Sequence, residues 1–514
     1  MNAFVQQHAD SVIGMIRGWD RLRFRGTVRM LANLTGMKRF LECTRHRLKE
    51  FGDYAQQTSR QVRSASLAVA ESAGRPVIHL DSPVAGKEEI ALEIARRDGI
   101  EEGLIAVVTA VESCCSYDVR SDRARGLLEL YPRQRKCQHL YHYMIHPLFG
   151  LMYARLQTWF PFNLFIGLNG REWLARQMDA AGIRYVRHDN CFPRISDPEA
   201  AQRMLDEQVN LNWEQTLGEL GRQVNPALEK IIGKLRIGYY WSLDQSEWAT
   251  DVMFKDRGEL DLLYPDLVRH AMESFRSPQV MSFLGRRVDK GITPRFSGEV
   301  VSDLCRRIEG TRVKHSVNRN SVKMYNKAGS ILRVETTLND MRDLRAPRVV
   351  DGRKVWMPMR KGVADMPRRA EVSDASSRRY LEALAAVNTP LPLKTLTDQL
   401  SKPTTWNGKR ARGLNLLGPD AEILQAVGGG EFLINGFRNR DVQAALFGPP
   451  SIDPAVNQKR SGQVTRKLRL LRAHGLIQKV PHTHRYLVSA KGRQLIAALH
   501  AAREADIQKL SKAA

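Results

Sequence analysis

The amino-acid sequence predicts an α+β protein of several domains, and three observations support this prediction. The chain has 514 residues, enough for roughly two to four hydrophobic cores. Strand-like and helix-like segments follow one another in mixed order, as in α+β domains. Basic residues gather in two parts of the chain. We expect a mixed-sheet N-terminal domain (1–235), a basic, sheet-bearing middle domain (236–350), a basic linker with short helices (351–415) and a C-terminal domain (416–514).

The N-terminal domain is predicted from apolar runs and from alternation of apolar and polar residues. Gly18-Trp19-Asp20 separates two strand-like runs at 11–16 and 21–28. The β-branched run 103–111 has the length of a buried strand. Residues 136–169 alternate like a hairpin or meander with a turn at 147–150. We also expect helices at about 37–74, 87–97 and 169–181, and a strand at 76–80.

The middle domain opens with the aromatic run 239–251 and continues with helices near 258–285. Two strands about a turn at 326–330 are expected near its end. Pro347, Pro358 and Pro367 interrupt the basic stretch 347–375, which is typical of a linker. A short helix is expected at about 377–386.

The charge distribution indicates the class of partner. The formal net charge is +25. Residues 301–370 hold 17 Lys and Arg against 7 Asp and Glu, and residues 431–500 hold 12 against 3, so these stretches supply 19 of the 25 excess charges. Because a merely solvated surface would not concentrate charge in this way, a polyanion such as nucleic acid is the expected partner.

The sequence lacks the motifs and segments that are typical of several other classes of protein. No apolar run approaches the length of about 18 residues that a membrane helix needs, and the N-terminus lacks a secretion signal, so a cytoplasmic protein without a membrane partner is expected. The six cysteines form no CxxC pair, which predicts free thiols. The absence of GxxxxGK and GxSxG motifs disfavours ATP hydrolysis and serine hydrolase chemistry.

The C-terminal domain has the clearest pattern of helix and strand signals in the chain. A helix opens after Pro419-Asp420 and stops at the glycines 428–430, and 432–434 is a short strand. A second helix is expected around 442–447, and a third from about 457 to 474, closed by Gly475. A strand, a basic loop and a returning strand follow at 476–489. This order, with the segment 465–477, resembles the winged-helix repressor families of bacteria, which implies a winged helix-turn-helix that binds DNA.

The third helix carries the residues expected to contact DNA. Val464, Leu468 and Leu471 can face a core, and the polar side chains lie mostly on the other side. Arg and Gln can read base edges, and Lys and Arg neutralise phosphates. The candidate contacts in this helix and the following loop are Gln463, Thr465, Arg466, Lys467, Arg469, Arg472, His484 and Arg485. The alternative is a module that contacts protein or RNA.

A second constellation lies in the strands about the turn at 326–330. Alternation places Lys323, Tyr325 and Lys327 on one face of the first strand, and Arg333 and Glu335 on one face of the second. Such a face can hold a phosphodiester, with cations on its oxygens and Tyr325 as nucleophile or stacking ring. Further cationic contacts are expected from Arg312, Lys314 and Arg319. The alternative is a structural hairpin without catalysis.

The Lys-x-Tyr-x-Lys order followed by Leu-Arg-x-Glu resembles replication initiation proteins of filamentous phages and small plasmids. The resemblance covers about 25 residues and implies DNA nicking through Tyr325, assisted by Lys323, Lys327 and a divalent metal. The chain departs from that pattern because it lacks a His-hydrophobe-His pair: His142 and His146 are four residues apart.

Carboxylates are the candidate ligands for such a metal, Mg²⁺ or Mn²⁺. Glu335 is one. Asp244, Glu247 and Asp251 would share a face if their segment were helical, and Glu247 and Asp251 are the further candidates. The ordinary alternative is a cap with surface ion pairs. Asp20 and Glu112 each end an apolar strand, which is weaker evidence.

The aromatic side chains of 141–162 allow two interpretations, base stacking or a hydrophobic core. They are Tyr141, Tyr143, Tyr153, Trp159, Phe160 and Phe162.

As a whole, the chain resembles uncharacterised proteins of bacterial mobile elements. We therefore expect a DNA-handling protein that serves replication initiation or strand processing for a plasmid- or phage-like element. The alternatives are a winged-helix transcriptional regulator without enzymatic activity, and an RNA-binding partner of a structured RNA. A homodimer is compatible with each of them.

Overall fold

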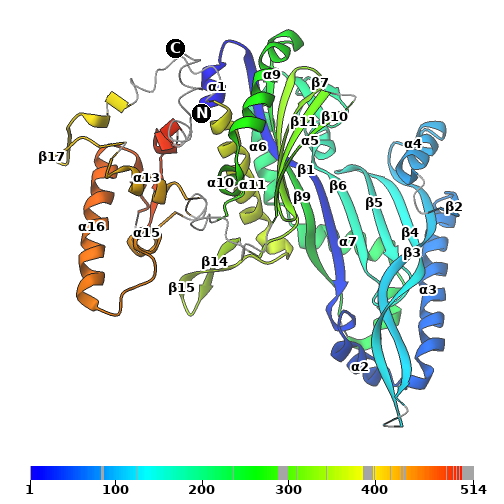
Figure 1. The fold of residues 1–514 in the computed structure, drawn as a ribbon. Helices are drawn as coiled ribbons and strands as arrows, with labels where there is room; N and C mark the ends of the chain where they lie inside the picture. The colour runs from blue at the N-terminus through cyan, green and yellow to red at the C-terminus, as the bar shows by residue number, and fades with distance from the viewer. Residues whose placement is uncertain are drawn as a thin grey trace. The chain divides into compact units, whose positions relative to one another are not determined.

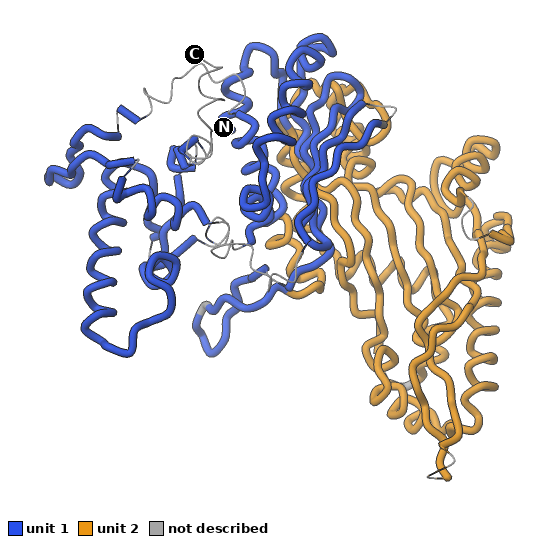
Figure 2. Tube along the Cα trace, in the orientation of Figure 1, with its two compact units in different colours: residues 1–15, 249–359, 371–514 blue, residues 16–248, 360–370 orange. Residues whose placement is uncertain are grey.

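The computed structural model describes residues 2–499 apart from 83–85, 123, 125, 236, 287–298, 308–309, 343, 386–396, 399, 417, 430–431, 433–435, 482, 490, 494 and 497. The chain forms two compact units (Figure 2). Unit 1 comprises residues 1–15, 249–359 and 371–514, and unit 2 comprises residues 16–248 and 360–370. Each contains helices and sheet, which confirms the α+β class.

Unit 2 combines a sheet with a set of helices (Figure 1). Its strands are β1 (Val12–Val28), β2 (Val77–Leu80), β3 (Gly103–Asp122), β4 (Leu127–His146), β5 (Gly150–Gln157), β6 (Leu164–Asn169), β7 (Tyr185–His188), β8 (Cys191–Ile195) and the first part of β9 (Tyr239–Phe254). Its helices are η1 (Arg29–Leu31), α2 (Leu34–Cys43), η2 (Leu48–Glu50), α3 (Phe51–Ser72), α4 (Lys87–Arg97), α5 (Gly170–Ala180), α6 (Pro198–Val209), α7 (Trp213–Val224), α8 (Leu228–Ile232) and η3 (Gly233–Leu235).

The unit 2 sheet is mixed and runs in the order β1-β6-β5-β4-β3-β2, with only β2 and β3 parallel among these neighbours. One face packs against helices. Phe24 on β1 lies 5.2 Å from the ring of Trp213 on α7, and His142 on β4 bonds Ser66 on α3. The predicted meander at 136–169 is confirmed as β4, β5 and β6.

β1 differs from the sequence prediction of two strands. It is one strand of 17 residues that passes through Gly18. A Cβ built at Gly18 would lie 2.8 Å from Leu205 Cδ2. This glycine therefore admits close packing of α6 and does not mark a turn.

Unit 1 contains a second group of strands and helices. Its strands are the end of β9, β10 (Val300–Arg307), β11 (Gly310–Val317), β12 (Asn320–Lys327), β13 (Ile331–Leu338), β14 (Arg345–Val350), β15 (Arg353–Pro358), β16 (Thr404–Trp406), β17 (Lys409–Ala411), β18 (Ile477–Lys479) and β19 (Tyr486–Val488). Its helices are α1 (Ala3–Gln7), α9 (Arg257–Ser274), α10 (Ser277–Phe283), α11 (Met366–Leu384, except for 366–370), α13 (Ala421–Val427), α15 (Asn439–Phe447) and α16 (Pro454–Ala473).

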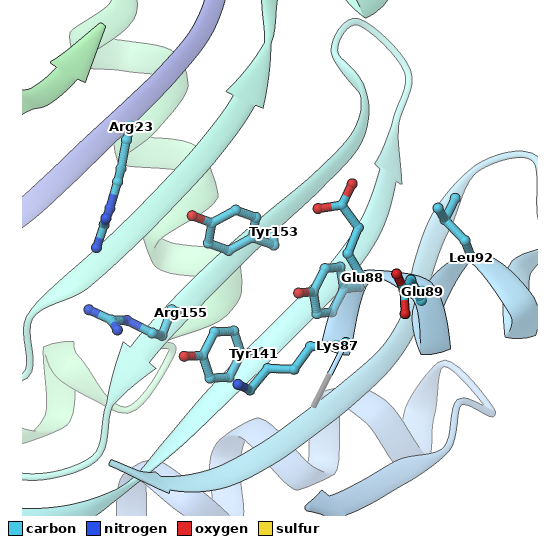
Figure 3. A pocket seen from close by; sticks show the side chains of 10 residues that line it. Arg23, Lys87, Glu88, Glu89, Leu92, Tyr141, Tyr153 and Arg155 are labelled. Carbon is cyan, nitrogen blue, oxygen red and sulfur yellow. The ribbon is translucent and has the colours of Figure 1, made fainter. Parts of the chain in front are cut away.

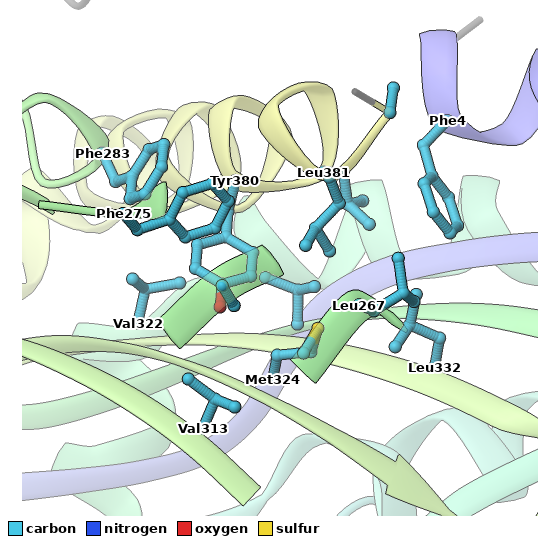
Figure 4. Packing of buried hydrophobic residues seen from close by; sticks show 14 of the residues in the cluster. Phe4, Leu267, Phe275, Phe283, Val313, Val322, Met324, Leu332, Tyr380 and Leu381 are labelled. Atoms are coloured by element: carbon cyan, nitrogen blue, oxygen red, sulfur yellow. The ribbon is translucent and has the colours of Figure 1, made fainter. Parts of the chain in front are cut away.

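The main sheet of unit 1 runs in the order β10-β11-β12-β13-β9. Alternation along β12 and β13 turns Val322, Met324 and Val334 into a buried core, which Tyr380 and Leu381 of α11 also enter (Figure 4). A linker with a short helix was expected where α11 lies. That expectation was wrong for this segment, because α11 has 19 residues and its apolar side contributes to the core.

The C-terminal part of unit 1 has a separate core. Val464, Leu468 and Leu471 of α16 pack with residues of α13, α15, β18 and β19. The three predicted helices and the strand–loop–strand are present, and β18 pairs antiparallel with β19. Leu433 and Ile434, in the predicted strand 432–434, lie outside the described residues, whereas Phe437 forms a bridge with Tyr486.

Among the described residues, no helix combines the length and the apolar character needed to cross a membrane.

Candidate nucleic-acid interface

The strands β12 and β13 bring the predicted polar face together. Lys323 pairs with Glu335 across the two strands, and Tyr325 pairs with Arg333. Lys323 Nζ lies 2.6 Å from Glu335 Oε1, and the Tyr325 hydroxyl donates to Oε2 at 2.8 Å. One carboxylate thus joins the phenol and one of the predicted cations.

The surroundings of Glu335 favour its ionised form. Its side chain is almost fully buried, and burial alone would raise its pKa. The ion pair with Lys323 and the hydrogen bonds from Lys323 and Tyr325 outweigh burial and hold the pKa of Glu335 below its ordinary value. The ionised carboxylate accepts the hydrogen bond of the Tyr325 hydroxyl and holds the phenol in place.

Arg333 does not have the role predicted for it. Its side chain is 0% exposed, and its Nε and Nη2 lie 2.5 and 2.8 Å from the two oxygens of Asp251. A guanidinium enclosed in this way cannot contact nucleic acid, so the prediction of a phosphate contact was wrong. Lys327 is also buried, at the end of β12.

The other predicted cations of this region are more accessible. Arg312 and Lys314 on β11 are half-buried, and Arg319 in the turn before β12 is exposed. Arg312 lies 3.7 Å from Asp303.

The segment that carries Asp244, Glu247 and Asp251 is the strand β9, so the condition for their alignment on one helical face is not met. Period-two alternation leaves Asp244 on the opposite face from the other two. Asp244 lies 3.8 Å from Lys361, and Glu247 accepts a hydrogen bond from Gln245.

Glu335 and Asp251, two of the candidate ligands for Mg²⁺ or Mn²⁺, already have partners at both carboxylate oxygens. Lys323 and Tyr325 bond the two oxygens of Glu335, and Arg333 bonds both oxygens of Asp251. A divalent cation would have to displace these partners. The assignment of Mg²⁺ or Mn²⁺ to Glu335, Glu247 and Asp251 therefore stays a prediction.

Helix α16 presents a basic face opposite its core side. Val464, Leu468 and Leu471 are buried, whereas Arg466 and Arg469 are exposed on the other side of the helix. Lys459, two turns before Arg466, is exposed on the same side. The helix has six Lys or Arg and no Asp or Glu among its 20 residues.

Other predicted contacts of α16 have partners inside the region. Lys467 Nζ donates to the carbonyl of Pro419 at 2.9 Å, and the Arg472 guanidinium lies 4.8 Å from the Trp406 ring. Thr465 Oγ1 accepts from Asn439 at 2.8 Å. Gln463 is half-buried, next to the core residue Val464. Fewer basic side chains of α16 are therefore exposed and available to DNA than the sequence predicted.

The loop between β18 and β19 carries two predicted contacts. His484 is exposed, and Arg485 is half-buried with Nη1 3.3 Å from the carbonyl of Gly436. Burial and the neighbouring Arg438 lower the pKa of Arg485. Of the two predicted contacts in this loop, His484 is therefore the more exposed.

Sequence reasoning missed a third group of cations, in unit 2. Arg21, Arg23 and Arg25 occupy alternate positions of β1, and the intervening Leu22 and Phe24 are buried. The signal was present as Arg-Leu-Arg-Phe-Arg, a period-two pattern that places arginines on one face. In the aromatic group, Phe160 and Phe162 are core residues, 0% exposed, whereas Tyr153 lies half-exposed on β5.

Comparison with known proteins does not place the chain in a family. No family model and no curated protein matches the sequence. A solved structure described as the di-domain ARO/CYC BexL from the BE-7585A biosynthetic pathway is similar at 11% identity, over 50% of this chain and 82% of that one, with a TM-score of 0.15. A TM-score this low supports no conclusion about fold or function.

Proposed function

We propose that this protein binds DNA and serves replication initiation or strand processing of a plasmid- or phage-like element. The C-terminal helices and hairpin act as a winged-helix module that docks α16 on duplex DNA. The observation that carries this proposal is the acid-free helix α16, with Lys459, Arg466 and Arg469 exposed opposite its core. A helix of this kind fits a major groove and neutralises phosphates.

The strand-processing part of the proposal depends on Tyr325. Glu335 accepts its hydrogen bond at 2.8 Å and can take the phenol proton as the oxygen attacks a backbone phosphorus. The new bond joins Tyr325 to phosphorus, the bond from phosphorus to the sugar oxygen breaks, and that oxygen takes a proton from water. Lys323 stabilises charge at the same carboxylate.

A transcriptional regulator without catalysis is the second candidate. It is favoured by the burial of Glu335, which is 3% exposed and has both oxygens engaged, as in a structural ion pair. In that case the hairpin stabilises unit 1, and only the DNA-binding module has a direct function.

The DNA-binding module is tested with the double variant Arg466→Ala/Arg469→Ala. Its affinity for duplex DNA should fall roughly ten-fold or more, because each base-reading arginine contributes about 1–3 kcal/mol. The matched control Arg60→Ala/Arg203→Ala removes two exposed arginines from α3 and α6 and should bind as the wild type does. Equal affinities of the two double variants in an anisotropy titration would refute the role of α16.

A further inference from the structure

Unit 2 contains a cavity of about 510 Å³ on the side of its sheet where α4 begins. Its walls combine aromatic rings with cations (Figure 3). Tyrosines of β4 and β5, Arg155, Arg23 and Lys87 line it, together with Glu88 and Glu89 of α4. In Figure 3, the side chains of Arg23 and Arg155 point into the same space beside the tyrosine rings.

Strand register explains why these side chains share one face. Tyr143 pairs with Tyr153, and Arg155 pairs with Tyr141 on one side and Phe165 on the other. Arg23 pairs with Gly167 on the next strand. The intervening residues of these strands, such as Leu22, Ala154 and Ile166, are buried on the opposite face. This polar-aromatic face lies opposite the one that α3 and α7 cover, and α4 packs on part of it, over Tyr141 and Tyr143.

Three guanidinium groups converge on this face. The Cζ atoms of Arg23, Arg25 and Arg155 lie 5.2, 5.6 and 4.4 Å from the centroid of the Phe165 ring. Arg155 pairs with Glu112 at 3.3 Å, but among the described residues Arg23 and Arg25 have no acidic partner. The Nε of Arg25 is also buried without a hydrogen-bond partner. Like charges gathered in this way destabilise one another, and a bound polyanion would relieve that repulsion.

Tyr153 lies in a position suited to stacking. A Cβ built at Gly167 would lie 2.3 Å from Tyr153 Cε1, so the ring lies across the neighbouring strand over the glycine. A ring that lies along the sheet turns one of its faces away from the sheet, where a base can stack. A side chain at position 167 would displace the Tyr153 ring, so the glycine is needed for the ring to lie in this position.

From this geometry we infer that the polar-aromatic face of unit 2 binds single-stranded nucleic acid, with Tyr153 stacking on a base and Arg23, Arg25 and Arg155 binding phosphates. The inference depends on the proposed function only in that both concern nucleic acid, since α16 belongs to unit 1. Single strands expose base faces that a duplex hides, and open antiparallel sheets with aromatic and basic side chains recognise them. The arginine row continues to Arg25, which does not line the cavity, so the ligand is longer than one nucleotide.

The test measures binding of a fluorescently labelled 15-nucleotide oligothymidylate to the full chain by anisotropy. Tyr153→Ala should weaken binding roughly ten-fold or more through the loss of stacking, and Tyr153→Phe should retain it. Arg23→Gln/Arg25→Gln should reduce the magnitude of the slope of log K against log salt by about 1.4, because each lost phosphate contact contributes about 0.7. Arg60→Gln/Arg203→Gln should change the affinity little. Circular dichroism verifies that each variant is folded.

Two results would overturn the inference. One is unchanged oligothymidylate binding in folded Tyr153→Ala and Arg23→Gln/Arg25→Gln variants. The other is competition by thymidine monophosphate at the same concentration as the oligonucleotide, which would identify a small-molecule site. Failure here remains distinguishable from failure of the proposed function, because Arg466→Ala/Arg469→Ala should lose duplex binding and keep oligothymidylate binding.

Discussion

The buried pair of Asp251 and Arg333 gives the most quantitative prediction for unit 1. Both side chains are almost completely enclosed, at 1% and 0% exposure, and two N–O distances are 2.5 and 2.8 Å. Arg333→Met removes the cation and leaves the carboxylate of Asp251 buried without it. Loss of one partner of such a pair costs about 3–5 kcal/mol, because the remaining charge stays desolvated. With a urea m-value of about 3 kcal/mol per M, the unfolding midpoint should fall by about 1–2 M.

The double variant Arg333→Met/Asp251→Leu distinguishes ion pairing from packing. Because it removes both charges, it should be more stable than either single variant. Urea unfolding is followed by circular dichroism, and hydrogen exchange in β12 and β13 assigns the loss to unit 1. A single-variant loss below about 1 kcal/mol would refute the account of this pair. Reduced DNA affinity of Arg333→Met without lower stability would restore Arg333 as a nucleic-acid contact.

Two further predictions concern catalysis and pH. If Tyr325 is a nucleophile, single-stranded origin-like DNA should form a covalent adduct visible on a denaturing gel, and Tyr325→Phe should abolish it; an adduct that persists in Tyr325→Phe would exclude this role. Burial lowers the pKa of His142 and of His315 to about 4, so each stays neutral in the folded chain while the unfolded chain takes up protons below pH 6.5. The free energy of unfolding should therefore fall as the pH is lowered from 6.5 to 4, by about 1.4 kcal/mol per pH unit for each histidine. The variant His142→Gln should reduce the slope of the unfolding free energy against pH, and an unchanged slope in a folded variant would contradict the lowered pKa of His142.

The sequence predicts elements well where one local pattern determines them. Period-two alternation at 136–169 and the apolar spacing of Val464, Leu468 and Leu471 correspond to β4–β6 and α16. The Lys-x-Tyr-x-Lys and Arg-x-Glu spacings likewise place Lys323, Tyr325 and Glu335 on one face of a hairpin.

The sequence predicts poorly where the partner is distant along the chain. Arg333 appears as an available cation until Asp251, 82 residues earlier, is brought against it. Gly18 has the local pattern of a strand break, but it is needed for the approach of Leu205. Arg23 and Arg25 of β1 became part of a candidate site only when pairing with β6 placed Gly167 and Phe165 beside them. Tertiary contacts, which local propensity does not encode, decide each of these cases.

Binding of DNA through α16 can be examined in the cell by recovering the cross-linked protein from its host and sequencing the nucleic acid bound to it. If α16 binds DNA, a defined duplex locus, such as a replication origin, should be enriched with the wild type and lost with Arg466→Ala/Arg469→Ala. Recovery of a structured RNA in place of DNA, or no enrichment above a mock purification, would contradict it.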